Sequence, residues 1–171
     1  MDNFTRAFLI VVGIEAGLSL DPDDPGNWTG HAKGAGILKG TKYGISAAAN
    51  PSLDIANLTL VQAKAIYLAD YWNDVRADAL SWPLACYVFD AAVNQGQPKA
   101  KLLLQTALGV VADGVIGPVT LAAASRAGAY QNAAFMTARA FDYMKKANFP
   151  HDGHGWFNRL FEIAEASNGV G

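Results

Sequence analysis

Residues 15–46 read EAGLSLDPDDPGNWTGHAKGAGILKGTKYGIS. Glycine recurs throughout this segment, and a dense turn sequence occupies residues 21–26. The spacing of three and four residues between apolar positions, which marks a helix, is absent from about residue 18 to residue 57. Residues 37–46 favour a short β-hairpin. An irregular segment of this length inside a small domain is usually functional, so we expect it to carry the site.

Helical patterns lie on both sides of this segment. Apolar residues at helical spacing predict a first helix over 3–16, with Glu15 at the edge of its apolar face. A capping box at Thr59 opens the next helical pattern. The later helices are predicted at 60–71, 83–94, 98–109, 118–127, 130–146 and 155–166, with a loop at 148–155. The predicted fold class is therefore mainly α, with a long loop and a short β-hairpin inserted after the first helix.

The composition excludes several classes of protein. The chain has 171 residues, 51% of them hydrophobic and 16% charged, and Cys86 is the only cysteine, which excludes a disulfide scaffold. A net charge of −2 argues against electrostatically driven binding of nucleic acid. The longest apolar run, 7–14, is too short for a bilayer span of about 20 residues, and no clear signal peptide is present. We expect synthesis in a cytoplasm, no stable membrane insertion and no nucleic-acid partner.

Two carboxylates in residues 15–46 suggest acid–base chemistry. Glycoside hydrolysis needs one carboxyl group held protonated as a general acid, and a second carboxylate that stabilises the cation or positions water. Partial burial beside an apolar face raises the pKa of a glutamate, and this suits Glu15 to the first role. Asp24 follows nine residues later, across one turn, and is the candidate for the second role; Asp21 and Asp23, which suit a turn, are the alternatives.

Three motifs in order resemble those of the glycoside hydrolase family 108 lysozymes, which are mostly phage endolysins and related bacterial muramidases. The motifs are Glu15-Ala-Gly-Leu18, Asp21-Pro-Asp-Asp-Pro-Gly26 and Thr41-Lys-Tyr-Gly-Ile-Ser46. The resemblance implies a lysozyme-like helical fold and cleavage of the β-1,4 bond between N-acetylmuramic acid and N-acetylglucosamine. It also implies that the enzyme acts on the periplasmic cell wall after release, through a holin, and is bacteriolytic.

The resemblance also implies roles for individual residues. Glu15 is the general acid, and Asp24 orients or activates water by analogy with phage T4-type lysozymes. Thr41 helps to hold that water, and Thr29 competes with it for this role. Trp28, Tyr43 and Thr29 are the predicted substrate contacts. The sequence departs from the family pattern at Ala16, where the family has glycine, and at Leu18, where it has an aromatic residue.

The second half of the chain resembles the small predicted peptidoglycan-binding module that follows many such catalytic regions. Its motifs are Phe89-Asp-Ala-Ala-Val-Asn94 and Asp113-Gly-Val-Ile-Gly-Pro118-Val-Thr120. We therefore expect a catalytic region at 1–85 and a peptidoglycan-binding helical region at 86–171, packed as one body. The expected partner is the glycan strand of bacterial peptidoglycan, and the expected state is a monomer.

Other interpretations remain open at this stage. The chain is either a hydrolase, a non-catalytic wall-binding module in which Glu15 is structural, or a lytic transglycosylase that needs no second carboxylate. The pair His151 and His154 has metal-ligand spacing but no third ligand nearby, and the acidic turn lacks the last ligand of a calcium loop. We expect no metal and no cofactor.

Overall fold

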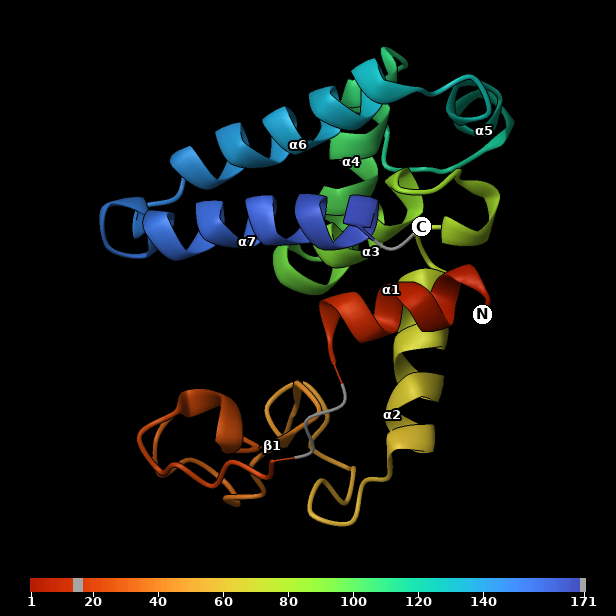
Figure 1. The fold of residues 1–171 in the computed structure, drawn as a ribbon. Coiled ribbons are helices and arrows are strands. Elements are labelled where there is room, and N and C mark those ends of the chain that lie inside the picture. The colour runs from red at the N-terminus through yellow and green to blue at the C-terminus, as the bar shows by residue number, and fades with distance from the viewer. Residues whose placement is uncertain (14–16, 170–171) are drawn as a thin grey trace. The chain divides into compact units, whose positions relative to one another are not determined.

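A computed structural model describes residues 1–13 and 17–169 of the chain. Over these residues the protein is mainly helical, with seven α-helices and one two-stranded antiparallel hairpin (Figure 1). This confirms the predicted fold class and is consistent with a lysozyme-like fold. The chain divides into two compact units, one made of Met1–Val11 with Leu68–Gly171 and the other of Val12–Tyr67.

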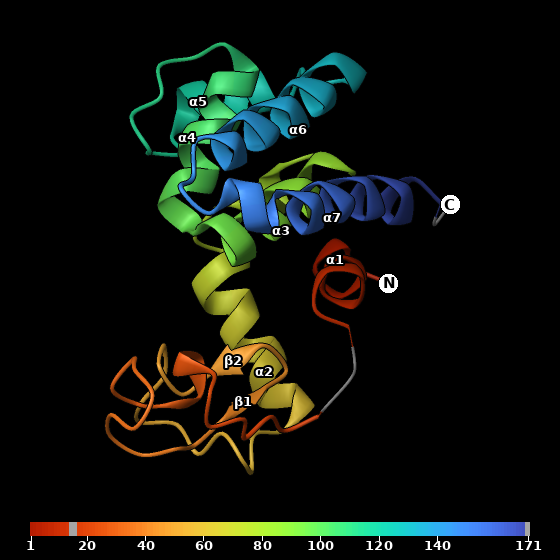
Figure 2. The same cartoon turned by 90° about the vertical axis from the view of Figure 1, so that its left-hand side faces the viewer.

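The larger unit is built around one buried helix. Helix α3 (Leu84–Gln95) is buried at every position from Leu84 to Ala92, and it packs against α1, α4, α6 and α7. Figures 1 and 2 show α6 and α7 lying side by side. The bounds of these helices are Asn3–Val11 for α1, Gln97–Leu108 for α4, Ala129–Met144 for α6 and Phe149–Gly169 for α7, and the short α5 spans Pro118–Ala124.

Aromatic side chains join α1 to the rest of this unit. The ring of Phe4 lies 5.6 Å from that of Trp72 and 6.1 Å from that of Phe89, both edge to face, and Trp72 in turn lies 5.5 Å from Phe89. Trp72 and Phe89 are fully buried. Edge-to-face pairs of this kind add stabilisation beyond the burial of their area, so the cluster holds α1 in a fixed place on α3.

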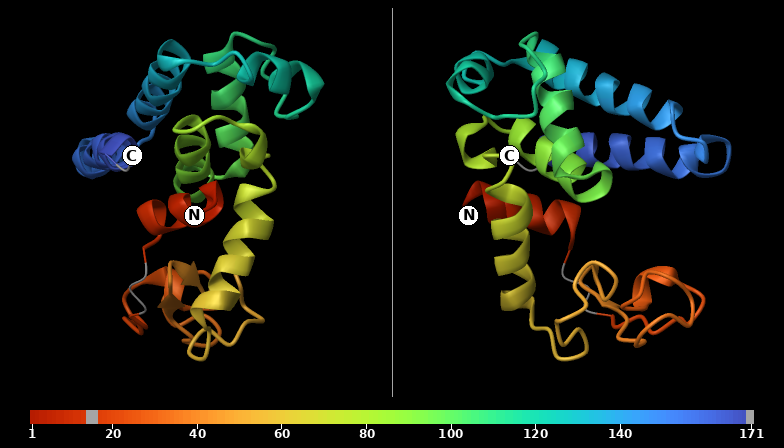
Figure 3. Two further views of the ribbon diagram at one scale, coloured as in Figure 1. Left: turned by 45° about the vertical axis from the view of Figure 1, so that its right-hand side comes forward. Right: turned by 180° about the vertical axis from the view of Figure 1, so that it is seen from behind.

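The smaller unit is mostly loop, as the orange part of the ribbon in Figure 3 shows. It contains a turn of 3-10 helix (η1, Pro25–Asn27), the hairpin strands β1 (Thr41–Lys42) and β2 (Ile45–Ser46), and α2 (Leu60–Ile66). The predicted capping box is confirmed. The Thr59 hydroxyl accepts a hydrogen bond from the backbone N–H of Gln62, and the Gln62 side-chain oxygen accepts one from the backbone N–H of Thr59. Helix α2 continues as a wider π-helical turn, η2 (Tyr67–Trp72), and a short η3 follows at Ala77–Ala79.

Two helix boundaries differ from the predictions by more than one helical turn. The first helix ends at Val11, and Gly13 adopts a positive φ of 76° that a helix interior excludes. The predicted loop at 148–155 is wrong, since α7 already begins at Phe149. One of its glycines, Gly153, is needed for close packing, because a Cβ there would lie 2.5 Å from the Phe149 ring. No described helix is long and apolar enough to cross a membrane.

Candidate active site

Asp24 lies at the start of a turn that its own side chain stabilises. Its Oδ1 accepts a hydrogen bond of 2.8 Å from the Gly26 amide and so caps η1, whose first residue is Pro25. The side chain is exposed, and its Oδ2 has no hydrogen-bond partner among the residues that the structure describes. Local hydrogen bonding therefore fixes one oxygen and leaves the other available to water or to a ligand.

Asn27 is the buried centre of this loop. Its side chain is fully buried, and Nδ2 donates to the backbone oxygen of Asp21 at 3.0 Å and to Ser19 Oγ at 3.3 Å. Its Oδ1 accepts from Thr41 Oγ1 at 2.7 Å. Its backbone N–H donates to the backbone oxygen of Asp24 at 3.1 Å. Asn27 thus ties the turn of Asp24 to the hairpin of Thr41.

Thr41 opens β1, and its hydroxyl has a defined direction. Paired backbone hydrogen bonds with Ser19, of 2.9 and 3.0 Å, hold its main chain. Because the hydroxyl proton is donated to Asn27, the lone pairs of Oγ1 are left to accept a hydrogen bond. Thr41 is therefore set up as an acceptor for the hydrogen of a water molecule.

Tyr43 stands at the tip of the hairpin. It and Gly44 both have positive φ, 51° and 72°, which is the signature of a two-residue type I′ turn. The Tyr43 backbone oxygen accepts from the Tyr67 hydroxyl at 3.0 Å. The Lys42 ammonium lies 5.7 Å from the centre of the Tyr43 ring, within cation–π range.

Trp28 contacts the turn of Asp24, and both Trp28 and Thr29 take part in the pairing with residues 37 and 38. Trp28 Nε1 donates to the Pro22 oxygen at 2.9 Å, and its backbone forms a bridge with Leu38. Thr29 Oγ1 accepts from the Ile37 amide at 2.9 Å. The structure thus brings Thr41 together with the turn of Asp24, and it places Thr29 in the pairing of 28–38. Glu15 lies outside the described residues.

A groove of about 410 Å³ lies beside this loop but contains none of the predicted site residues. Leu18, one of the two departures from the family pattern, forms part of its wall together with Leu20 and Leu53. The walls are largely leucine and isoleucine, and Lys39 and Asp54 supply the charged groups. Hydrogen bonds from Asn57 lower the pKa of Asp54 below its ordinary value, so this carboxylate is ionised at neutral pH.

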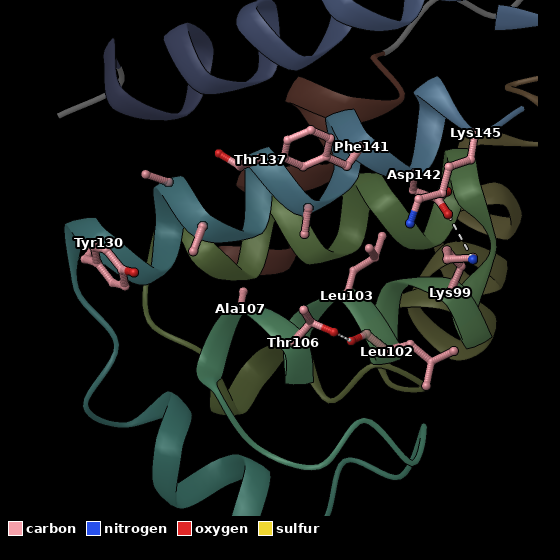
Figure 4. Close-up of a pocket in the computed structure, with 13 residues that line it drawn as sticks. Lys99, Leu102, Leu103, Thr106, Ala107, Tyr130, Thr137, Phe141, Asp142 and Lys145 are labelled. Atoms are coloured by element: carbon pink, nitrogen blue, oxygen red, sulfur yellow. Dashed lines mark hydrogen bonds and ion pairs between the residues drawn. The ribbon is translucent and has the colours of Figure 1, made fainter.

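A larger groove, of about 830 Å³, lies between α4 and α6 of the other unit (Figure 4). Figure 4 shows Tyr130 at one end and Lys99, Asp142 and Lys145 at the other. Burial alone would raise the pKa of Asp142, but hydrogen bonds from Lys99, at 2.9 Å, and from the half-buried Gln95 lower it below its ordinary value. This end of the groove therefore holds two ammonium groups and one ionised carboxylate.

Metal binding and thiol chemistry find no support in the described residues. No cluster of three histidine, cysteine or acidic side chains lies among them. His151 instead pairs with Asp152 at 2.5 Å, and this hydrogen bond raises the pKa of the exposed His151. Cys86 is buried, and desolvation raises the pKa of its thiol to about 12, so it is not a nucleophile at neutral pH.

The comparisons with known proteins bear on the same segment. The family model described as glycosyl hydrolase 108 matches residues 8–96, just over half of the chain. The chain belongs to glycosyl hydrolase family 108. Among solved structures it is similar to Brucella abortus SagA, with 29% sequence identity, a TM-score of 0.75, and coverage of 95% of this chain and 92% of that one. No curated protein matches the chain.

Membership of this family makes the protein a glycoside hydrolase and supports a role as a cell-wall hydrolase. The matched residues include the whole loop-rich segment. The sequence predicts roles for Asp24 and Thr41 in that segment but does not indicate Asn27, which joins them. Nothing in a single sequence distinguishes this asparagine from an ordinary turn residue, because its role depends on burial.

Proposed function

We propose that the protein hydrolyses the β-1,4 bond between N-acetylmuramic acid and N-acetylglucosamine in peptidoglycan. The family match over residues 8–96 is the observation that carries this proposal, because it includes Glu15, Asp24 and Thr41. The indirect link of Asp24 to Thr41 through Asn27 supports it further. The phage endolysin role, with holin-dependent release to the periplasmic wall, belongs to the same proposal.

Each residue has one task in this reaction. Glu15, protonated, gives its proton to the glycosidic oxygen as the bond to the muramic acid carbon breaks, and the sugar passes through a cation-like transition state. Water then bonds to that carbon, and Asp24 takes the water's proton through Oδ2, the oxygen not used in the cap. Thr41 accepts a second hydrogen bond from the same water. Trp28 and Tyr43 contact the sugars.

Lysis of outer-membrane-stripped Gram-negative cells tests these assignments. We expect Glu15→Gln and Asp24→Asn to lower the lysis rate about 100-fold or more, which is the usual contribution of a positioned acid or base. Asp23→Asn is the matched control, because Asp23 is an exposed neighbour that forms an ion pair with Lys33. Full lysis by Glu15→Gln contradicts the proposal and favours a wall-binding module.

The products separate hydrolysis from the third possibility, lytic transglycosylation. Hydrolysis leaves reducing muramic acid ends, whereas attack by the sugar's own 6-hydroxyl leaves anhydro ends. Mass spectrometry of a complete digest therefore decides between the two reactions. We expect reducing ends, because only hydrolysis gives Asp24 and Thr41 a water molecule to hold.

We further propose that residues 86–171 bind peptidoglycan, with the groove between α4 and α6 as the binding surface. Exposed rings of Tyr130 and Phe141 border this groove. Lys99 is paired with Asp142, so Lys145 supplies the net positive charge that complements the carboxylates of stem peptides. In the background of Glu15→Gln, which prevents digestion, we expect Tyr130→Ala with Lys145→Glu to weaken co-sedimentation with sacculi. Phe161→Ala, an exposed ring outside this groove, is the control. Equal binding by all variants contradicts the assignment.

A further inference from the structure

One carboxylate in the core of the larger unit is held by two arginines. Asp90, on α3, is fully buried, and its Oδ2 accepts from Arg139 Nη2 at 2.6 Å. Its Oδ1 accepts from both Nε and Nη2 of Arg159, at 2.9 and 2.5 Å. A buried carboxylate persists only with such partners, because removing its charge from water is costly.

The two arginines differ in what else they contact. Arg139 is fully buried, and its Nε donates to Gln95 Oε1 at 2.8 Å, so its remaining contacts stay inside the helical core. Arg159, on α7, keeps about a third of its side chain exposed. Its Nη2 also donates to the backbone oxygen of Val11 at 3.1 Å.

Val11 is the last residue of α1, where the final carbonyl groups lack partners within the helix. A cationic side chain at this end both satisfies a carbonyl and complements the helix dipole. Two guanidinium groups around one carboxylate leave one net positive charge. The guanidinium of Arg159 lies at the end of α1, where it donates to the Val11 backbone oxygen. Asp90 thus anchors Arg159, and Arg159 holds Val11.

Val11 is also the point at which the chain leaves the larger unit, since the smaller unit begins at Val12. Glu15 follows four residues after Val11, so the chain between them spans at most about 14 Å. We propose that Arg159, anchored by Asp90, is a positioning residue that fixes the end of α1 from which the chain reaches Glu15. This inference rests on the hydrolase function proposed above.

The two arginines provide a matched test in the full-length protein. We expect Arg159→Met to lower kcat on soluble peptidoglycan oligomers about tenfold or more, with KM changed less than twofold, since misplacement by about 1 Å can cost 100-fold. Amide exchange in a peptide covering residues 9–17 should become faster. Arg159→Lys keeps the positive charge but lacks the planar guanidinium that bonds Asp90 through two nitrogens. Its kcat and its amide exchange should therefore lie between those of the parent and of Arg159→Met.

Arg139→Lys is the control, because it disturbs the same carboxylate without contacting α1. It should lower the melting temperature yet leave kcat per folded molecule, and exchange in residues 9–17, within twofold of the parent. The proposal is overturned if Arg159→Met leaves either kcat or this exchange unchanged, or if Arg139→Lys changes both equally. Failure of the hydrolase proposal appears separately, as full activity of Glu15→Gln.

Discussion

Replacing Asn27 with alanine should destabilise the loop that carries Asp24 and Thr41. The substitution removes three side-chain hydrogen bonds of a fully buried amide, to Ser19, Asp21 and Thr41. Each is worth about 1 kcal/mol net, so the expected loss in the free energy of unfolding is about 3 kcal/mol. For a chain of this length, that loss lowers the melting temperature by about 6–12 °C.

Urea unfolding followed by circular dichroism measures this loss. Thr41→Val removes one of the three hydrogen bonds and should cost about 1 kcal/mol, whereas Thr41→Ser keeps the hydroxyl and should cost less. Asn73→Ala serves as the control, because Asn73 is exposed and changes at such positions usually stay within about 0.5 kcal/mol. The three results together separate buried hydrogen bonding from the mere loss of an amide.

A loss below about 1 kcal/mol for Asn27→Ala would refute the reasoning, because it would mean that the buried amide does not hold the loop. Equal losses for Asn27→Ala and Asn73→Ala would do the same. If the reasoning holds, Asn27→Ala should also slow cell lysis more than the stability loss explains, since Thr41 then loses the acceptor that fixes its hydroxyl.

Three further perturbations test other parts of the structure. Gly36→Ala should cost more stability than Gly34→Ala in thermal melts, since both have positive φ but only at Gly36 would a Cβ lie 2.3 Å from a threonine oxygen. Gly153→Ala should destabilise by about 1–3 kcal/mol through its close ring contact, whereas Gly155→Ala, in open space on the same helix, should stabilise by up to about 1 kcal/mol. Cys86, with its pKa raised to about 12 by burial, should resist a thiol reagent at pH 8 until urea unfolds the chain.

The helices of the larger unit were largely predictable from local signals. Proline and glycine mark their ends, and α3 runs from Leu84 to Gln95 between Pro83 and Gly96, within a residue of the prediction. Helix α4 likewise ends at the left-handed Gly109. Such signals act over one or two turns, so a single sequence carries them.

Features that depend on distant residues were not predictable. The sequence predicts a loop at the start of α7, where glycines disfavour a helix, yet Gly153 packs against the ring of Phe149 within that helix. The partners of Asp90 follow it by 49 and 69 residues, and nothing local to Asp90 indicates them. Asn27 was missed for the same reason, since Thr41 lies 14 residues away.

The end of the family match and the packing of the helical core together predict whether a chain ending at Gly96 can fold. The match ends at Gly96, directly after α3, and the predicted boundary between residues 85 and 86 falls inside that helix. The prediction that the two halves have separate tasks stays a prediction. A chain ending at Gly96 would lack α4, α6 and α7, all of which pack on α3.

That shorter chain would also lose both arginines that hold Asp90, and removing one partner of a buried ion pair alone costs about 3–5 kcal/mol. Since small proteins are stable by only about 5–15 kcal/mol, residues 1–96 should show no cooperative unfolding transition in near-ultraviolet circular dichroism. Asp90→Asn in the shorter chain should not restore the transition, because the apolar cover of α3 is still missing. A cooperative transition in residues 1–96 would show that the catalytic region has a core of its own.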